Sequence, residues 1–155
     1  MKKYLFCLVL ALAIGQMSYA QSVEKFLENV SNTENVDKVK IGHFMMSLGK
    51  IFGGVGDMPV ARGVHTLEVY DLAACNAGVK KDLLNQLNRL KDSDGYETLI
   101  MAKDKGDNVR IMMKKKKDEI SDLVILCMDE NDPTVVKISG KIKEKDLAEL
   151  TDKYN

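Results

Sequence analysis

The chain has 155 residues, of which 23 are basic and 23 are acidic. This balance excludes a protein that holds nucleic acid or an anionic membrane surface through a large positive net charge. Hydrophobic residues make up 45% of the chain, which is enough for one packed core in a domain of ordinary size.

The N-terminus has the pattern of a secretory signal peptide. Lys2 and Lys3 give a positive start, residues 4–14 are almost wholly apolar, and small residues at 18 and 20 form a signal peptidase site. We therefore predict a signal peptide over residues 1–20, cleavage before Gln21, and a single α+β domain over residues 21–155. The apolar run is too short to cross a bilayer, which takes about 20 apolar residues.

Export leaves the destination open between the periplasm, the outer cell surface and the medium. A lipid anchor is the less favoured alternative, because Cys7 lies at the beginning of the apolar run and an acylated cysteine would follow it. No second long apolar run occurs in the sequence, so we expect no transmembrane segment after cleavage.

Three segments in the first ninety residues show helical periodicity. The first begins at Ser22; the second follows a short strand at residues 36–41 and ends at Gly53; the third begins at Asn76. Their apolar stripes are Val23, Phe26, Leu27 and Val30; Phe44, Met45, Leu48, Ile51 and Phe52; and Val79, Leu83, Leu84, Leu87 and Leu90. The glycines that end the second helix do not form a phosphate loop, since such a loop opens a helix.

Residues 63–71 are predicted as a strand whose side chains alternate between two faces. One face would carry Val64, Thr66, Glu68 and Tyr70, and the other His65, Leu67 and Val69.

A four-strand antiparallel meander is predicted for the C-terminal half, with strands at 97–103, 108–113, 120–128 and 134–139. In the second of these strands, Val109, Ile111 and Met113 face the core, while Asn108 and Arg110 face the wetter side. Residues 123–128 are apolar on both faces, which predicts a central strand. Gly140 would then turn the chain into a last helix with Leu147, Leu150 and Tyr154 toward the core. The fold class is therefore α+β: two layers, a mainly antiparallel sheet, and helices packed on one face.

Two cysteines remain after cleavage, Cys75 and Cys127. An exported chain with two cysteines can join them in a disulfide. The alternative is two buried thiols, because Cys127 lies inside the most apolar strand and a free cysteine packs as a small hydrophobe.

The residue types of common catalytic and metal sites are sparse. His43 and His65 are the two histidines, and neither has the spacing to other ligands that a zinc site needs. We expect His65 to pack against Leu67 and Val69 as a hydrogen-bonded histidine. We expect no cofactor, no metal and no identifiable catalytic residue, so the chain favours a non-enzyme.

The strongest local charge is the run Lys114, Lys115, Lys116 and Lys117. Lysines at the end of a hairpin keep it solvated and protect the sheet from edge pairing. The same four residues form the candidate partner surface, for an anionic partner at the cell envelope.

The chain resembles the secreted bacterial domain-of-unknown-function 4252 family (DUF4252). The resemblance is carried by the signal peptide, the strand and helix at 36–52, and the segments 95–99, 120–126 and 135–142. These motifs are patterns of apolar residues and glycine, so the resemblance implies a fold and export into a Gram-negative envelope. It supplies no catalytic residues.

We therefore expect a non-enzymatic binding or interaction domain of the bacterial cell envelope, with an unidentified envelope protein or ligand as its partner. One alternative is a small exported enzyme with a carboxylate and histidine site. Another is a regulatory partner of an envelope signalling system.

Overall fold

The computed structural model describes residues 21–42, 62–129 and 131–148. Two helices, α2 (Val23–Asn32) and α5 (Ala77–Arg89), lie on a sheet of six strands. The strands are β1 (Asp37–Gly42), β2 (Val64–Asp71), β3 (Tyr96–Asp104), β4 (Asp107–Lys116), β5 (Glu119–Met128) and β6 (Thr134–Lys143). Residues 144–148 form a short helical turn.

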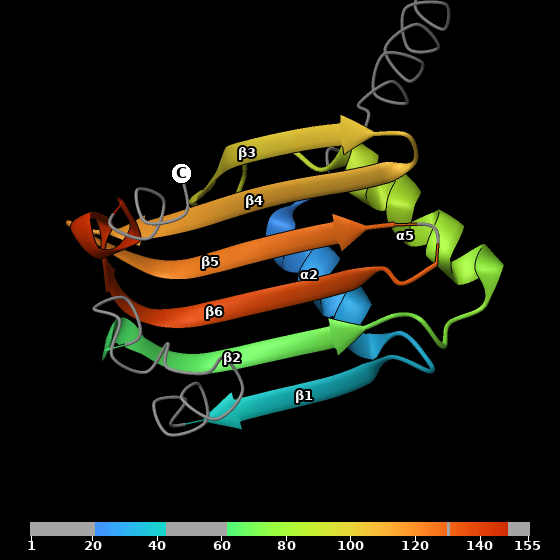
Figure 1. Cartoon of the computed structure of the whole chain (residues 1–155), viewed down its shortest axis with the longest axis horizontal. Coiled ribbons are helices and arrows are strands. Elements are labelled where there is room, and N and C mark those ends of the chain that lie inside the picture. Colours follow the sequence, from blue (N-terminus) through green and yellow to red (C-terminus); the bar gives the residue numbers. More distant parts are fainter. Residues whose placement is uncertain (1–20, 43–61, 130, 149–155) are drawn as a thin grey trace, which may run out of the picture.

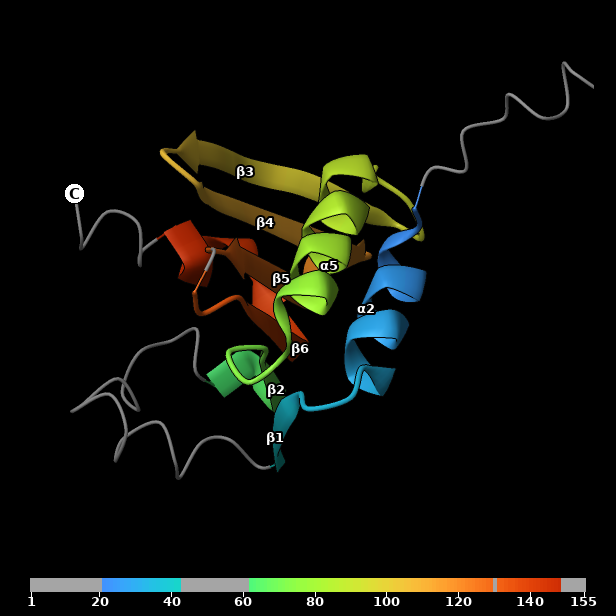
Figure 2. The ribbon, with the colours of Figure 1, turned by 90° about the vertical axis from the view of Figure 1, so that its right-hand side faces the viewer.

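The sheet is antiparallel throughout, in the order β1-β2-β6-β5-β4-β3 (Figure 1). Its last four strands follow one another as the predicted meander, and β5 is central as predicted. Both helices lie on the same side of the sheet (Figure 2). The α+β class and the mainly antiparallel sheet are therefore confirmed. The predicted signal peptide, the predicted helix at 44–52, His43, Leu150 and Tyr154 lie outside the described residues.

The two helices begin where the sequence predicts. Ser22 Oγ accepts a hydrogen bond from the backbone N–H of Lys25 at 3.2 Å, and Asn76 Oδ1 accepts one from Val79 at 2.9 Å. Each bond satisfies a backbone donor that has no partner inside its helix. The loop before β3 adds a second cap to α2, because Ser93 Oγ accepts from the backbone N–H of Val23 at 3.0 Å.

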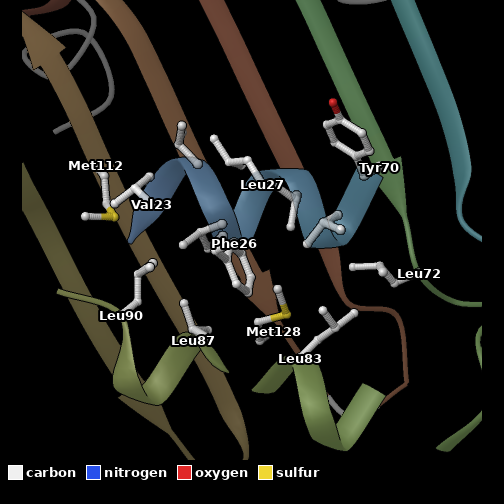
Figure 3. Close-up of a cluster of buried hydrophobic side chains, with 14 of the residues drawn as sticks. Val23, Phe26, Leu27, Tyr70, Leu72, Leu83, Leu87, Leu90, Met112 and Met128 are labelled. Carbon is white, nitrogen blue, oxygen red and sulfur yellow. The ribbon is translucent and has the colours of Figure 1, made fainter. Parts of the chain in front are cut away.

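The main core lies between the helices and the sheet (Figure 3). Phe26 of α2 is fully buried there between Leu87 of α5 and Met128 of β5, and Met112 of β4 lies beside Val23. The cluster consists of Val23, Phe26, Leu27, Val30, Tyr70, Leu72, Cys75, Leu83, Leu87, Leu90, Tyr96, Met112, Val124, Leu126, Met128 and Val135. Burying one large side chain of this kind contributes about 1.5–3 kcal/mol, so the cluster fixes which face of each strand the helices cover.

One face assignment made from the sequence is wrong. Asn108 and Arg110 are buried on the helix side of β4, next to the core residue Met112. Val109 and Ile111 are half-buried on the opposite side. The buried face of β4 therefore carries the polar residues, because Arg110 finds hydrogen-bond partners under α5, as described below.

The sequence suggested that Gly140 ends the last strand. This is wrong, because β6 continues to Lys143. The role of Gly140 is a close approach between strands. A Cβ at Gly140 would lie 2.0 Å from the carbonyl oxygen of Gly63, and a Cβ at Gly63 would lie 2.4 Å from that of Lys141. The register of β2 against β6 shifts at this point, between Val64 and Thr66.

This shift is a β-bulge, and it changes the predicted faces of β2. Val64 joins Leu67 in a second apolar cluster on the side of the sheet away from α2 and α5. His65 is displaced from the row of Leu67 and Val69 and is exposed. The expectation that His65 packs with those two residues is therefore wrong.

Gly140→Ala should destabilise the protein by about 3 kcal/mol, the upper end of the usual cost of overpacking. The added methyl group would collide with backbone, which cannot rotate away. Urea unfolding followed by circular dichroism measures the change. The control is Gly78→Ala in the first turn of α5, where the nearest atom is the side-chain oxygen of Asn76 at 3.3 Å. Because a side chain can shift slightly, stability should change by less than about 1 kcal/mol. Equal unfolding midpoints for the two variants would contradict the contact.

Leu126→Asp and Ile125→Asp should differ sharply, although they alter neighbouring residues of β5. Leu126 is fully buried under the helices, so a carboxylate there has no partner and should prevent folding. Ile125 is half-buried on the other face, so its variant should fold with a loss of about 1–2 kcal/mol. Thermal denaturation measures whether each variant has a cooperative unfolding transition. If neither variant has one, the second face is packed as tightly as the first.

Candidate interaction surfaces

A row of six β-branched side chains crosses the whole sheet on the face opposite α2 and α5. Paired residues lie directly across from each other on neighbouring strands, and the register joins one residue from each strand. This open-face row consists of Val39, Val69, Val136, Ile125, Ile111 and Ile100. Since strands lie about 4.8 Å apart, the row is about 24 Å long.

The row is exposed most at its two ends. Val39 on one edge strand and Ile100 on the other are each 50% exposed. The four residues between them are half-buried. Among the described residues, α2 and α5 lie on the other side of the sheet (Figure 1), and the turn at 144–148 adds Leu147 beside the second apolar cluster. Val69, Ile111 and Val136 also pack against that cluster, so the exposed apolar area lies at the two ends of the row. An apolar strip with exposed ends is a candidate interaction surface.

The edge strand β3 has two further exposed apolar residues, one on each side of Ile100 in the sequence. Leu99 is 41% exposed and Met101 is 54% exposed, on either side of Ile100. Met101 pairs with Arg110 and so lies on the helix side, whereas Ile100 pairs with Ile111 on the open side. The two neighbours therefore present equally exposed apolar groups to opposite faces of the sheet.

The lysine run separates into two pairs with different surroundings. Lys114 Nζ lies 3.1 Å from Glu24 Oε1 and above the ring of Tyr96. Lys115 forms an ion pair with Glu144, whose hydrogen bond raises the pKa of the lysine. Lys116 and Lys117 line a cavity instead, and neither has an ion-pair partner within the described part of the chain.

That cavity lies where three neighbouring strands lose regular register, and it measures about 400 Å³. His65 and Ser121 line it, and each is the residue that a β-bulge displaces from pairing. The lining is completed by Lys116, Lys117, Glu119, Gly140 and Lys141. The alternative of a small exported enzyme needs a histidine close to two acids. Among the described residues that line this cavity, His65 is accompanied by one acid, Glu119.

The buried polar site lies at the other end of the sheet, between β4, β3 and the end of α5. Arg110 is 6% exposed. Its Nη1 donates to the carbonyl oxygen of Leu90 at 2.6 Å, and its Nη2 donates to Thr98 Oγ1 at 2.8 Å and to Asp92 Oδ1 at 3.3 Å. These bonds tie the C-terminal cap of α5 to the sheet, where a cation also suits the helix dipole. Alternation along β4 alone placed this arginine on the wrong face.

Asp92 is held ionised by the same group of residues. Its carboxylate accepts hydrogen bonds from the Thr98 hydroxyl at 2.6 Å and from the Thr98 backbone at 3.2 Å. These bonds, together with the Arg110 guanidinium, lower the pKa of Asp92. All of these contacts end on Oδ1, and the side chain is half exposed. The carboxylate therefore links the loop after α5 to β3 and β4.

A second polar pair connects β1 to β2 on the helix side. Lys40 Nζ lies 3.1 Å from Glu68 Oε1, and the Tyr70 hydroxyl donates to Glu68 Oε2 at 3.2 Å. Burial would raise the pKa of Glu68, but these two contacts outweigh it, and the pKa lies below the ordinary value. Desolvation and the Glu68 carboxylate both raise the pKa of Tyr70.

The two cysteines are free thiols on opposite faces of the sheet, so the disulfide considered from the sequence is not formed in this structure. Cys75 belongs to the main core, and its thiol lies 3.5 Å from the Glu34 carbonyl oxygen. Cys127 alternates with the core residues Leu126 and Met128 and therefore lies on the open face. Burial raises the pKa of both thiols, which makes them poor nucleophiles.

No group of three or more His, Cys, Asp or Glu side chains with the geometry to hold a metal ion is found in the described ranges. None of the helices described there combines the length and the hydropathy that a membrane crossing requires.

These features define a class: a two-layer α+β domain with helices on one face of an antiparallel sheet and an apolar row across the other. A model of the family described as "Domain of unknown function (DUF4252)" matches residues 26–150. The chain belongs to this family. No curated protein and no solved structure matches it.

The Asp92 carboxylate should contribute less to the free energy of unfolding at acid pH, and the variant Asp92→Asn measures this contribution. A carboxylate whose pKa is lowered by folding contributes stability above its unfolded pKa of about 3.9, and this contribution is lost as pH falls through the folded value. Asp92→Asn should therefore cost about 0.5–1 kcal/mol at pH 7, as for an exposed ion pair, and less at pH 3. Urea unfolding at both pH values measures it.

The control for this experiment is Asp107→Asn at the exposed start of β4. It measures the general effect of removing one exposed carboxylate at each pH, and this effect is subtracted from that of Asp92→Asn. An Asp92→Asn difference that stays constant from pH 7 to pH 3 would show that the carboxylate charge does not stabilise the Arg110 site.

Proposed function

We propose that the protein is an exported, non-enzymatic binding domain of the bacterial cell envelope, and that it holds a partner protein against the open-face row. The row supports this proposal because six aligned β-branched side chains, one from each strand, present an apolar strip that ends at two exposed edges. A partner with a complementary apolar patch would remove this strip from water, which stabilises a complex in proportion to the apolar area buried.

The proposed partner is a protein because the row is apolar and spans all six strands. Small molecules bind in concave sites, whereas protein interfaces have an apolar centre with a polar rim. Charged side chains flank the row at its β1 end, where Asp37 and its cross-strand partner Asp71 share the open face with Val39 and Val69. A regulatory role toward an envelope signalling system would use the same surface with a specific partner.

The proposal is tested by comparing Ile100→Asp with Met101→Asp. Both residues lie on the exposed edge strand, and their exposed fractions are similar, but only Ile100 belongs to the row. A photo-crosslinking amino acid at position 125 would be introduced into each variant in intact cells. We expect a crosslinked partner in the unaltered protein and in Met101→Asp, and at least a tenfold lower yield in Ile100→Asp.

Equal crosslinking in the two variants would overturn the proposal. Crosslinks between two copies of the chain, matched by a concentration-dependent dimer in sedimentation, would replace the partner protein with a second copy. Cys127 lies on the open face, so its rate of alkylation reports whether solvent reaches that face in the purified protein. A rate as slow as that of buried Cys75 would show that the face is already covered.

Export is tested in the same cells. The proposal expects a mature chain that starts at Gln21 and is found in the envelope fraction or the medium. An intact N-terminus in the cytoplasmic fraction would contradict it.

A further inference from the structure

The cavity at the irregular end of the sheet is separate from the open-face row and has a different chemistry. Lys116 and Lys117 reach it from the end of β4 and the following turn, and Lys141 reaches it from β6. None of these three lysines has an ion-pair partner in the described part of the chain. Of the described residues that line the cavity, Glu119 alone is acidic.

Two glycines allow a close backbone contact between β6 and the start of β2 beside the cavity. Gly63 and Gly140 approach so closely that neither position can hold a Cβ, and Gly140 contributes bare backbone to the cavity lining. The bulge that accompanies this contact turns His65 out of the strand pairing and into the lining. A second bulge does the same to Ser121 on β5.

Bulges re-aim side chains and are frequent beside functional sites. Two of them on β2 and β5 flank the same stretch of β6, so the irregularity is not a single local defect. Regular pairing at either position would return His65 or Ser121 to the period-two alternation of its strand. Both bulges lie at the end of the sheet that carries Lys116, Lys117 and Lys141, whereas the register shift of β3, between Thr98 and Ile100, lies elsewhere.

We propose that this cavity binds a phosphate group, carried either by a small soluble ester or by a phospholipid headgroup. Lysine ammonium groups bind phosphate as point charges, and three of them against one carboxylate leave an excess of positive charge. The volume of about 400 Å³ falls in the range of small-ligand sites, about 300–1,000 Å³. This inference does not depend on the open-face row.

Isothermal titration calorimetry with glycerol 3-phosphate is the first arm of the test, with glycerol as the uncharged control. The second arm is sedimentation with vesicles of phosphatidylglycerol, against vesicles of phosphatidylcholine. Binding of glycerol 3-phosphate supports a soluble ester as the ligand. Binding confined to phosphatidylglycerol vesicles supports a lipid headgroup.

The double variant Lys116→Ala/Lys141→Ala should weaken whichever binding is observed by at least tenfold. The matched control, Lys25→Ala/Lys105→Ala, removes the same charge from exposed positions outside the cavity and should change affinity less than twofold. His65→Gln, which leaves all the lysines in place, should weaken binding several-fold and serves if the double variant does not fold. Binding in neither arm, or an equal loss in the two double variants, would overturn the proposal.

Discussion

The fold depends on one constraint: both described helices cover the same face of a sheet whose side chains alternate. Because successive residues of a strand point to opposite faces, packing Val124, Leu126 and Met128 under the helices sends Leu123, Ile125 and Cys127 to the other side. The same alternation acts on all six strands. The open-face row is therefore a consequence of the register of the whole sheet.

A one-sided antiparallel sheet usually has polar residues on its solvent side. In β4 the arrangement is reversed, since Asn108 and Arg110 are buried and Val109 and Ile111 are half-exposed. Burying an arginine is tolerated only when its donors are satisfied, and here they reach Leu90, Thr98 and Asp92. The apolar residues of β4 are consequently free for the face that α2 and α5 do not cover.

The sequence predicts the elements well because their signals are local. Ser22 and Asn76 cap the helices that they precede, and each predicted strand that lies in the described residues is a strand in the structure. Faces and strand ends were predicted less well, because they depend on distant partners. The bulge at His65 needs a contact between Gly63 and Gly140, and the burial of Arg110 needs the end of α5. Neither contact leaves a mark within the few neighbouring residues that a period-based prediction uses.

The two candidate surfaces follow from opposite properties of the same sheet. Across the middle of the sheet, β-branched residues of all six strands align and produce an apolar row. Where the register shifts on β2 and β5, displaced side chains and the bare backbone of Gly140 line a cavity. Its three lysines have no ion-pair partner among the described residues. A change that restored regular pairing at the irregular end would extend the sheet and fill the cavity, while leaving the central row untouched. The apolar surface and the basic cavity are thus physically separable, so the two proposed binding sites can be disrupted one at a time.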